Sequence, residues 1–536
     1  MSEALKKSAG DVPGGEGKSK RHLLILGAIL VLTFLLRFYG SWLPFLDDEP
    51  DIVVLAKTIS ITPGHLHLPI HGTQHGPLVL YLIRLGSLIA PGETFRFRLS
   101  YLLLGTFHIL LIYRLAREAL SVAGAIFAAL FLGTCEVHIL FTKYVTEELP
   151  TLFLVTLWFF VLWQGLRRDI RRLVLLSGVI LGLGLLAKYT IVFLVPTAFV
   201  FLLISGEYRH WLKRKEIYLS FLIALLVTSP NIYWNWRHNW FDYKGGAHYL
   251  APLSLSGFAA ELFFGWFTHH LSATDIVYGY DYMGPVAGGL AAMGILLAFG
   301  EARREFIKLM VVALWMVMGA SFLFAGGLPR HYAVAIIPAS VLTGLFLGTL
   351  WEKGLAVRIL ILLIFLTATI FSAKATADFN HYWVSQSSIR LSAWGEDGEI
   401  DLTTLSKAFI HLAQKYKATL AVFPARGLDS TGAYFTAYSN IPCISTHVFL
   451  RWLEYREEDL ERIVFFFRPR ERVRKFRGWA EANDYLLSPV IYDEITLKPE
   501  HENVTHRLPV RILIMTRKDY ERKPDIESLT QLVYGE

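Results

Sequence analysis

Residues 22–40, HLLILGAILVLTFLLRFYG, decide the fold class, because a membrane-spanning helix needs about 20 mostly apolar residues. The run is too long for a removed signal peptide and lacks a small-residue cleavage site, so we interpret it as a retained anchor. The chain of 536 residues is 54% hydrophobic and only 18% charged, with a mean hydropathy of +0.43. Soluble proteins carry about 25% charged residues. The composition excludes disorder, a collagen-like fibre and, since only Cys135 and Cys443 could pair, a disulfide scaffold.

Hydropathy along the chain predicts a polytopic α-helical membrane protein with about eleven transmembrane helices. They fall at residues 22–40, 96–114, 119–134, 149–165, 173–187, 190–205, 216–232, 283–300, 307–325, 331–350 and 355–373. Lys and Arg gather before the first span and in alternate loops, which places the N-terminus in the cytoplasm and the C-terminus outside. We therefore expect a multi-pass protein of the cell inner or plasma membrane. The net charge of +7 is a topology signal, and no nucleic-acid partner is expected.

The sequence divides into three parts. Residues 1–20 are predicted to form a disordered cytoplasmic tail, residues 21–375 the transmembrane domain, and residues 376–536 a small extracytoplasmic α/β domain. In the last part the patterns predict strands at 419–423, 462–467 and 510–516 and helices at 403–416 and 470–483. No Gly-rich phosphate loop follows these strands, so a nucleotide site is not expected there. The loops expected outside the membrane are 41–95, 135–148, 233–282 and the short segment GGLPRHY at residues 326–332.

Two acidic clusters lie in these outer loops. Asp48 and Glu49 belong to the run Asp47-Asp48-Glu49-Pro50-Asp51 after the first span, and Glu147 and Glu148 precede the fourth span. A carboxylate near an apolar wall can act as a general base toward an acceptor hydroxyl or amine. Alternatively, both clusters are ordinary helix starts, where acids complement the helix dipole.

Cations on the same side run against the positive-inside trend. Lys143, Lys188 and Arg330, the last followed by His331 and Tyr332, indicate an anionic ligand such as a phosphate. The alternative for Lys188 and Arg330 is snorkelling to lipid headgroups.

Histidines and tryptophans mark two further outer segments. His75 belongs to the segment HGTQHGPL at residues 71–78, where a divalent metal remains open although the spacing matches no standard zinc pattern. Hydrogen bonding of these histidines to backbone is the alternative. Trp234, Trp236 and Trp240 form either an interfacial aromatic belt or a platform for a lipid chain or sugar ring.

The order of these motifs resembles the GT-C glycosyltransferases, most closely the branch of protein O-mannosyltransferases and lipid A aminoarabinose transferases. The resemblance covers about residues 20–350 and includes the acidic pair, HGPL, Glu-Leu-Pro, GLGLLAKYT and Arg-His-Tyr before Ile-Ile-Pro. It implies an inverting transfer of a sugar from a polyprenyl-phosphate donor to an extracytoplasmic acceptor. It also implies that Asp48 is the base, that Glu147 or Glu148 is the second acid, and that Lys188 and Arg330 hold the donor phosphate. His75 would stand where the lipid A branch has a lysine.

Two other functions remain open. A flippase for a lipid-linked sugar would share the spans and the lipid groove, but it predicts paired repeats or broken helices near the midplane. A non-catalytic assembly subunit would use its C-terminal domain to bind a partner. It would leave the acidic clusters without a chemical role.

Overall fold

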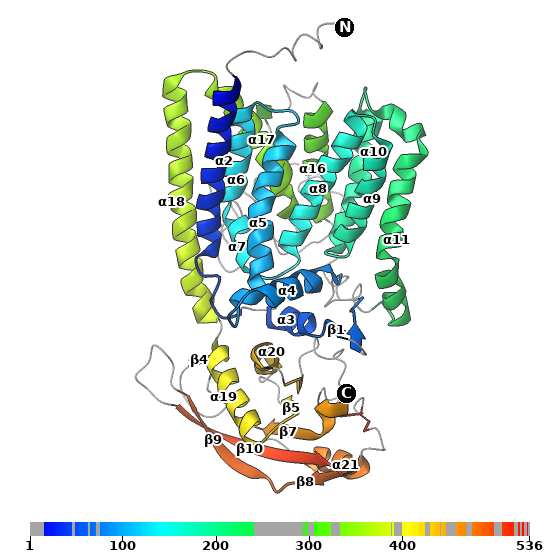
Figure 1. The fold of residues 1–536 in the computed structure, drawn as a ribbon, viewed down its shortest axis with the longest axis vertical. Helices are drawn as coiled ribbons and strands as arrows, with labels where there is room; N and C mark the ends of the chain where they lie inside the picture. The colour runs from blue at the N-terminus through cyan, green and yellow to red at the C-terminus, as the bar shows by residue number, and fades with distance from the viewer. Residues whose placement is uncertain are drawn as a thin grey trace.

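The computed structural model describes residues 15–45, 49–62, 65–70, 76–240, 293–294, 296–297, 305–322, 333–386, 388–390, 399–423, 429–439, 441–445, 457–467, 474–497, 506–518, 524–525, 528–529 and 533. Long apolar helices form a bundle, and a smaller sheet domain lies at one end of it (Figure 1). Helix α2 begins at the opposite end of the bundle from the sheet domain (Figure 1).

Ten of the predicted spans coincide with helical segments of the described chain. These are α2 (Gly15–Phe38), α5 (Phe95–Ala116), α6 (Val122–Thr134), α8 (Glu148–Arg167), α9 (Arg171–Leu185), α10 (Leu194–Ile204), α11 (Lys215–Arg237), α16 (Glu305–Phe322), α17 (Ile336–Trp351) and α18 (Leu355–Gln386). The predicted span 283–300 lies mostly outside the described residues. Within the described part, five helices are each long and apolar enough to cross a membrane, and a bent pair could supply a sixth.

Two predicted boundaries need correction. Helix α2 begins at Gly15, so the end of the predicted disordered tail is helical. The segment 135–148, predicted as a loop, contains helix α7 (Glu136–Lys143), which meets α6 at a bend of 57°. Polar residues in α7 hid it from a hydropathy search, but inside the bundle they have partners. His138 accepts from the buried Arg37, which also donates to the Gly133 carbonyl at the bend.

The described residues of the segment 41–95, which we call the first outer loop after its predicted position, lie across one end of the bundle (Figure 1). It contains α3 (Glu49–Lys57), the hairpin β1 (Ser60–Thr62) and β2 (His65–His67), and α4 (Leu78–Ile89). Helices α3 and α4 lie between the bundle and the sheet domain (Figure 1). Every residue of α3 from Glu49 to Ala56 is buried, so this loop is a packed layer at the end of the bundle.

The C-terminal domain is built around a mixed sheet of six strands. Its order is β6-β5-β7-β10-β8, with β9 also paired to β10. β5 is parallel to β6 and β7, whereas β10 is antiparallel to its three neighbours. The strands are β5 (Leu420–Phe423), β6 (Cys443–Ser445), β7 (Arg462–Phe467), β8 (Tyr485–Leu487), β9 (Ile491–Leu497) and β10 (His506–Arg517), with helices α19 (Leu402–Lys415), α20 (Asp429–Tyr438) and α21 (Arg474–Ala482) and a separate pair β3 (Ser388–Arg390) and β4 (Glu399–Asp401). All five elements predicted for this region are therefore present.

Candidate functional site

Two acids and a lysine meet at the end of α8 that faces the first outer loop. Nζ of Lys188, between α9 and the short helix η2 (Tyr189–Phe193), lies 3.1 Å from Oε1 of Glu147 and 3.0 Å from Oε1 of Glu148. The exposed fractions of these residues are 2–4%. The ammonium of Lys188 therefore bridges two carboxylates away from bulk water.

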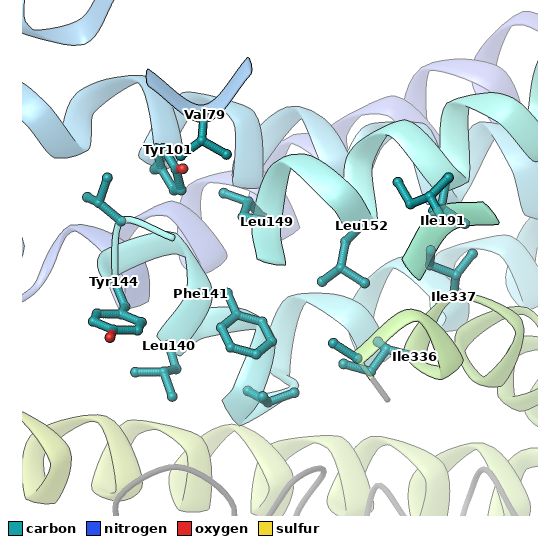
Figure 2. Close-up of a cluster of buried hydrophobic side chains, with 14 of the residues drawn as sticks. Val79, Tyr101, Leu140, Phe141, Tyr144, Leu149, Leu152, Ile191, Ile336 and Ile337 are labelled. Atoms are coloured by element: carbon teal, nitrogen blue, oxygen red, sulfur yellow. The ribbon is translucent and has the colours of Figure 1, made fainter. Parts of the chain in front are cut away.

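The backbone just before these acids is held by two other residues. The N–H of Val145 donates to Oε1 of Glu49 (2.9 Å), and the hydroxyl of Tyr101 donates to the carbonyl of Thr146 (2.5 Å). Beyond the acids, α8 continues with Leu149 and Leu152, which lie in a cluster of buried apolar side chains (Figure 2). The carboxylates therefore stand at the edge of an apolar wall, as expected for a site at the border of a membrane core.

Glu49, from the first acidic cluster, forms a buried ion pair with Arg98. Both of its carboxylate oxygens accept from Arg98 on α5, at 3.1 and 2.6 Å, and both side chains are fully buried. Arg98 also donates to the carbonyls of Ser41, Leu43 and Pro44. Glu49 thus joins the first outer loop to the segment that carries Glu147 and Glu148.

The HGPL segment approaches the same cluster through its glycine. A Cβ on Gly76 would lie 2.1 Å from the carbonyl oxygen of Leu186, so only glycine fits there. The N–H of Leu78 donates to that same carbonyl (2.9 Å). Since Leu186 is two residues from Lys188, this contact sets α4 beside the acid–lysine cluster. On the other side of the segment HGTQHGPL, Asn231 of α11 donates to the carbonyl of Ile70, which directly precedes it (3.0 Å).

Several predicted site residues lie outside the described residues. These are Asp48, His75, Arg330, His331 and Tyr332. The structure places Lys143 in a buried position, where Nζ lies 3.3 Å from Oδ1 of Asn380 on α18 and over the ring of Tyr39. This contact joins α7 to α18.

The three tryptophans lie at the last turn of α11 and just after it. Trp234 stacks on His238 with ring centroids 4.0 Å apart, while Trp236 and Trp240 are 60% and 40% exposed. This exposure fits both predicted interpretations, an interfacial belt and a platform. In the described part of the chain, no group of three His, Cys, Asp or Glu side chains is arranged to hold a metal ion. Cys135 and Cys443 are both buried.

Sequence reasoning missed Arg98 and Tyr101. Arg98 carried a usable signal, because it lies at the outer end of a predicted span, against the positive-inside trend. Tyr101 carried none, since a tyrosine in the first turns of a span is typical of an interfacial position. Both residues act across long sequence separations, with partners 49 and 45 residues away.

Comparison with known proteins gives a family match over part of the chain. Residues 74–234 match the family model of dolichyl-phosphate-mannose-protein mannosyltransferases. An uncharacterised protein of Aquifex aeolicus is 25% identical over 216 residues, which is 39% of this chain and 42% of that protein. The match therefore spans less than half the length of that relative. The matched segment includes His75, both acids of the second cluster and Lys188.

Solved structures match over far more of the chain. ArnT from Cupriavidus metallidurans superposes with a TM-score of 0.58 at 13% identity, covering 93% of this chain and 98% of its own. A second structure of that protein contains undecaprenyl phosphate. The oligosaccharyltransferase AglB from Archaeoglobus fulgidus, solved with an inhibitory peptide and dolichol-phosphate, has a TM-score of 0.54 at 13% identity, covering 84% of this chain and 70% of its own. These likenesses establish a shared fold.

Proposed function

We propose that this chain, which has the fold of the GT-C superfamily of polyprenyl-phosphate-sugar glycosyltransferases, moves a sugar from a polyprenyl-phosphate donor to an extracytoplasmic acceptor. The observation that carries the proposal is the buried cluster of Glu147, Glu148 and Lys188. It lies at the end of the bundle beside the first outer loop, where a lipid phosphate and a polar acceptor can meet. The predicted eleven spans and the outer position of the C-terminal domain are part of this proposal.

The proposed reaction is an inverting displacement at the anomeric carbon. Asp48, which directly precedes Glu49, removes the proton from the acceptor hydroxyl or amine as that atom attacks. A bond forms between the acceptor atom and the anomeric carbon, and the bond from that carbon to the phosphate oxygen breaks. The polyprenyl phosphate leaves with the electron pair. Glu147 or Glu148 orients the acceptor in this scheme.

The leaving phosphate gains negative charge as its bond to the anomeric carbon breaks, so the site needs positively charged groups near it. Before transfer, the ammonium of Lys188 would pair with the carboxylates of Glu147 and Glu148. During transfer, it would also attract the negative charge that develops on the leaving phosphate. Arg330 would supply bidentate contacts, with His331, Tyr332, His75 and Lys143 as further candidate donors. The apolar chain of the lipid would lie along the bundle, with Trp234, Trp236 and Trp240 as its platform.

The position of the acids also bears on the flippase alternative. Glu148 begins α8, and Glu49 begins α3 at the end of the bundle. A transporter of the inverted-repeat type binds its substrate near the midplane, at broken helices. Carboxylates at one end of the bundle favour chemistry at that surface.

A product assay tests the proposal. The purified protein in lipid vesicles receives a polyprenyl-phosphate donor with a radiolabelled sugar and a set of hydroxyl and amine acceptors. Label on the acceptor with inverted anomeric configuration supports the proposed transfer. Label that crosses the bilayer still attached to lipid supports the flippase, and label that stays in place supports the subunit. Glu147→Gln and Glu148→Gln should reduce transfer, whereas Asp169→Asn, which breaks an exposed pair with Arg214, should not.

A further inference from the structure

Helix α20 of the C-terminal domain forms hydrogen bonds with the backbone of Phe45 in the first outer loop. The hydroxyl of Tyr434 donates to the carbonyl of Phe45 (2.5 Å), and the N–H of Phe45 donates to the hydroxyl of Tyr438 (3.3 Å). The rings of Phe45 and Tyr438 lie 5.2 Å apart. Phe45 is fully buried and Tyr434 is 3% exposed. Both backbone polar groups of Phe45 are therefore held by tyrosines of the other domain.

The same helix is held at its C-terminal end by a lysine of α3. Nζ of Lys57 donates to the carbonyls of Thr436 (2.7 Å), Ala437 (3.1 Å) and Ser439. The last carbonyls of a helix have no partner within it, and the Lys57 side chain supplies donors to them. The contact fixes α20 to α3 directly.

Arg98 connects these two contacts to the candidate site. Its guanidinium donates to Glu49 and to the Pro44 carbonyl and lies over the Phe45 ring, 5.6 Å from its centre. Arg98 of α5 therefore contacts both Phe45 and Glu49. Phe45 is also held by two tyrosines of α20. Three residues separate Phe45 from Glu49, and the last of the three is Asp48. The contacts of Phe45 and Glu49 therefore hold both flanks of the segment that contains Asp48.

We infer that the C-terminal domain is a positioning element of the transfer site, acting through Tyr434 and Tyr438 on Phe45 and so on the loop that carries Asp48. The inference rests on the proposed function. It gives the C-terminal domain a role that requires no contact with the donor. Tyr434 and Tyr438 are positioning residues in this account, and Asp48 remains the group that meets the substrate.

The test compares Tyr434→Phe with a matched control in the same domain, Tyr485→Phe. Tyr485 also donates a buried hydroxyl to a carbonyl, that of Leu460 (2.8 Å), but within the domain. Hydrogen exchange of residues 41–57 and transfer kinetics are measured on the full-length protein. Tyr434→Phe should speed exchange of this segment about three- to tenfold, the equivalent of one lost hydrogen bond. It should lower kcat by a similar factor and leave the KM for the donor unchanged.

A double-mutant cycle separates positioning from a general loss of structure. If Tyr434 acts through Asp48, Tyr434→Phe should have no further effect on the residual turnover of Asp48→Asn. Unchanged exchange of residues 41–57 in Tyr434→Phe would overturn the inference. Faster exchange with normal kcat, or an equal effect from Tyr485→Phe, would also overturn it. If the wild-type protein transfers no sugar, the proposed function fails, and the exchange result still decides whether α20 anchors the loop.

Discussion

Replacing Arg98 by methionine should destabilise the protein strongly. Arg98 satisfies both oxygens of Glu49 and three backbone carbonyls, at 2.6–3.2 Å, and the pair is fully buried. Removal of one partner leaves a buried carboxylate without its cation, which costs about 3–5 kcal/mol. At about 2 °C per kcal/mol, the apparent melting temperature should fall by roughly 6–10 °C.

The assay is thermal unfolding of the purified protein in one detergent, followed by tryptophan fluorescence. The control is Arg167→Met, whose pair with Glu118 has a similar length, 2.9 Å, but leaves Arg167 half exposed. An exposed pair contributes at most about 1 kcal/mol, so the control should shift by about 2 °C or less. The double variant Glu49→Gln with Arg98→Met should recover part of the loss, because it removes the buried charge. Equal shifts for Arg98→Met and Arg167→Met would refute the reasoning.

Three further predictions concern the same end of the molecule. Gly76→Ala should destabilise the protein by about 1–3 kcal/mol and reduce transfer, because the added Cβ would clash with backbone. Gly206→Ala, which has open space around it, should change neither stability nor transfer. Melting curves and turnover measurements check both variants. Lys188→Met should lower both stability and turnover, and the added change Glu148→Gln should restore part of the melting temperature but not the turnover. Burial and two nearby arginines lower the pKa of Lys57 from 10.5 to about 7. Between pH 7 and 10, Lys57 therefore binds fewer protons when it contacts α20 than when this contact is broken. Protection of residues 41–57 from exchange, compared with that of a core helix, should therefore rise as the pH rises from 7 to 10, and Lys57→Met should abolish this slope.

The helices were predictable because their apolar runs approach the length of a bilayer core. The strands and helices of the C-terminal domain were predictable because their apolar residues follow simple periods. Helix α7 was not, since Glu136, His138 and Lys143 lower its hydropathy, and two of these polar side chains find partners only inside the bundle. Those partners are Arg37 and His108 for His138 and Asn380 for Lys143, between 30 and 237 residues away.

Glu147, Glu148 and Lys188 stood out in the sequence as single residues, but the contacts between them could not be predicted from it. The sequence predicted that Lys188 meets the donor phosphate, which stays a prediction, but it did not predict that its ammonium lies between Glu147 and Glu148. It predicted Glu49 as a catalytic acid beside Asp48, which stays a prediction, but it did not predict the bonds of Glu49 to Arg98 and to the N–H of Val145. A local pattern shows that a carboxylate lies at a membrane edge, but its partner depends on helix packing. The exclusion of Glu49 from solvent strengthens the case for its neighbour as the base.

Turnover of Asp48→Asn tests the central claim most directly. The measurement is sugar transfer from a saturating polyprenyl-phosphate donor to a competent acceptor, by wild-type and variant proteins with equal melting temperatures. A general base contributes about 10²–10⁴-fold to the rate, so the variant should lose at least about a hundredfold in kcat and keep its affinity for the donor. Near-normal turnover in the variant would contradict the assignment of Asp48 as the base.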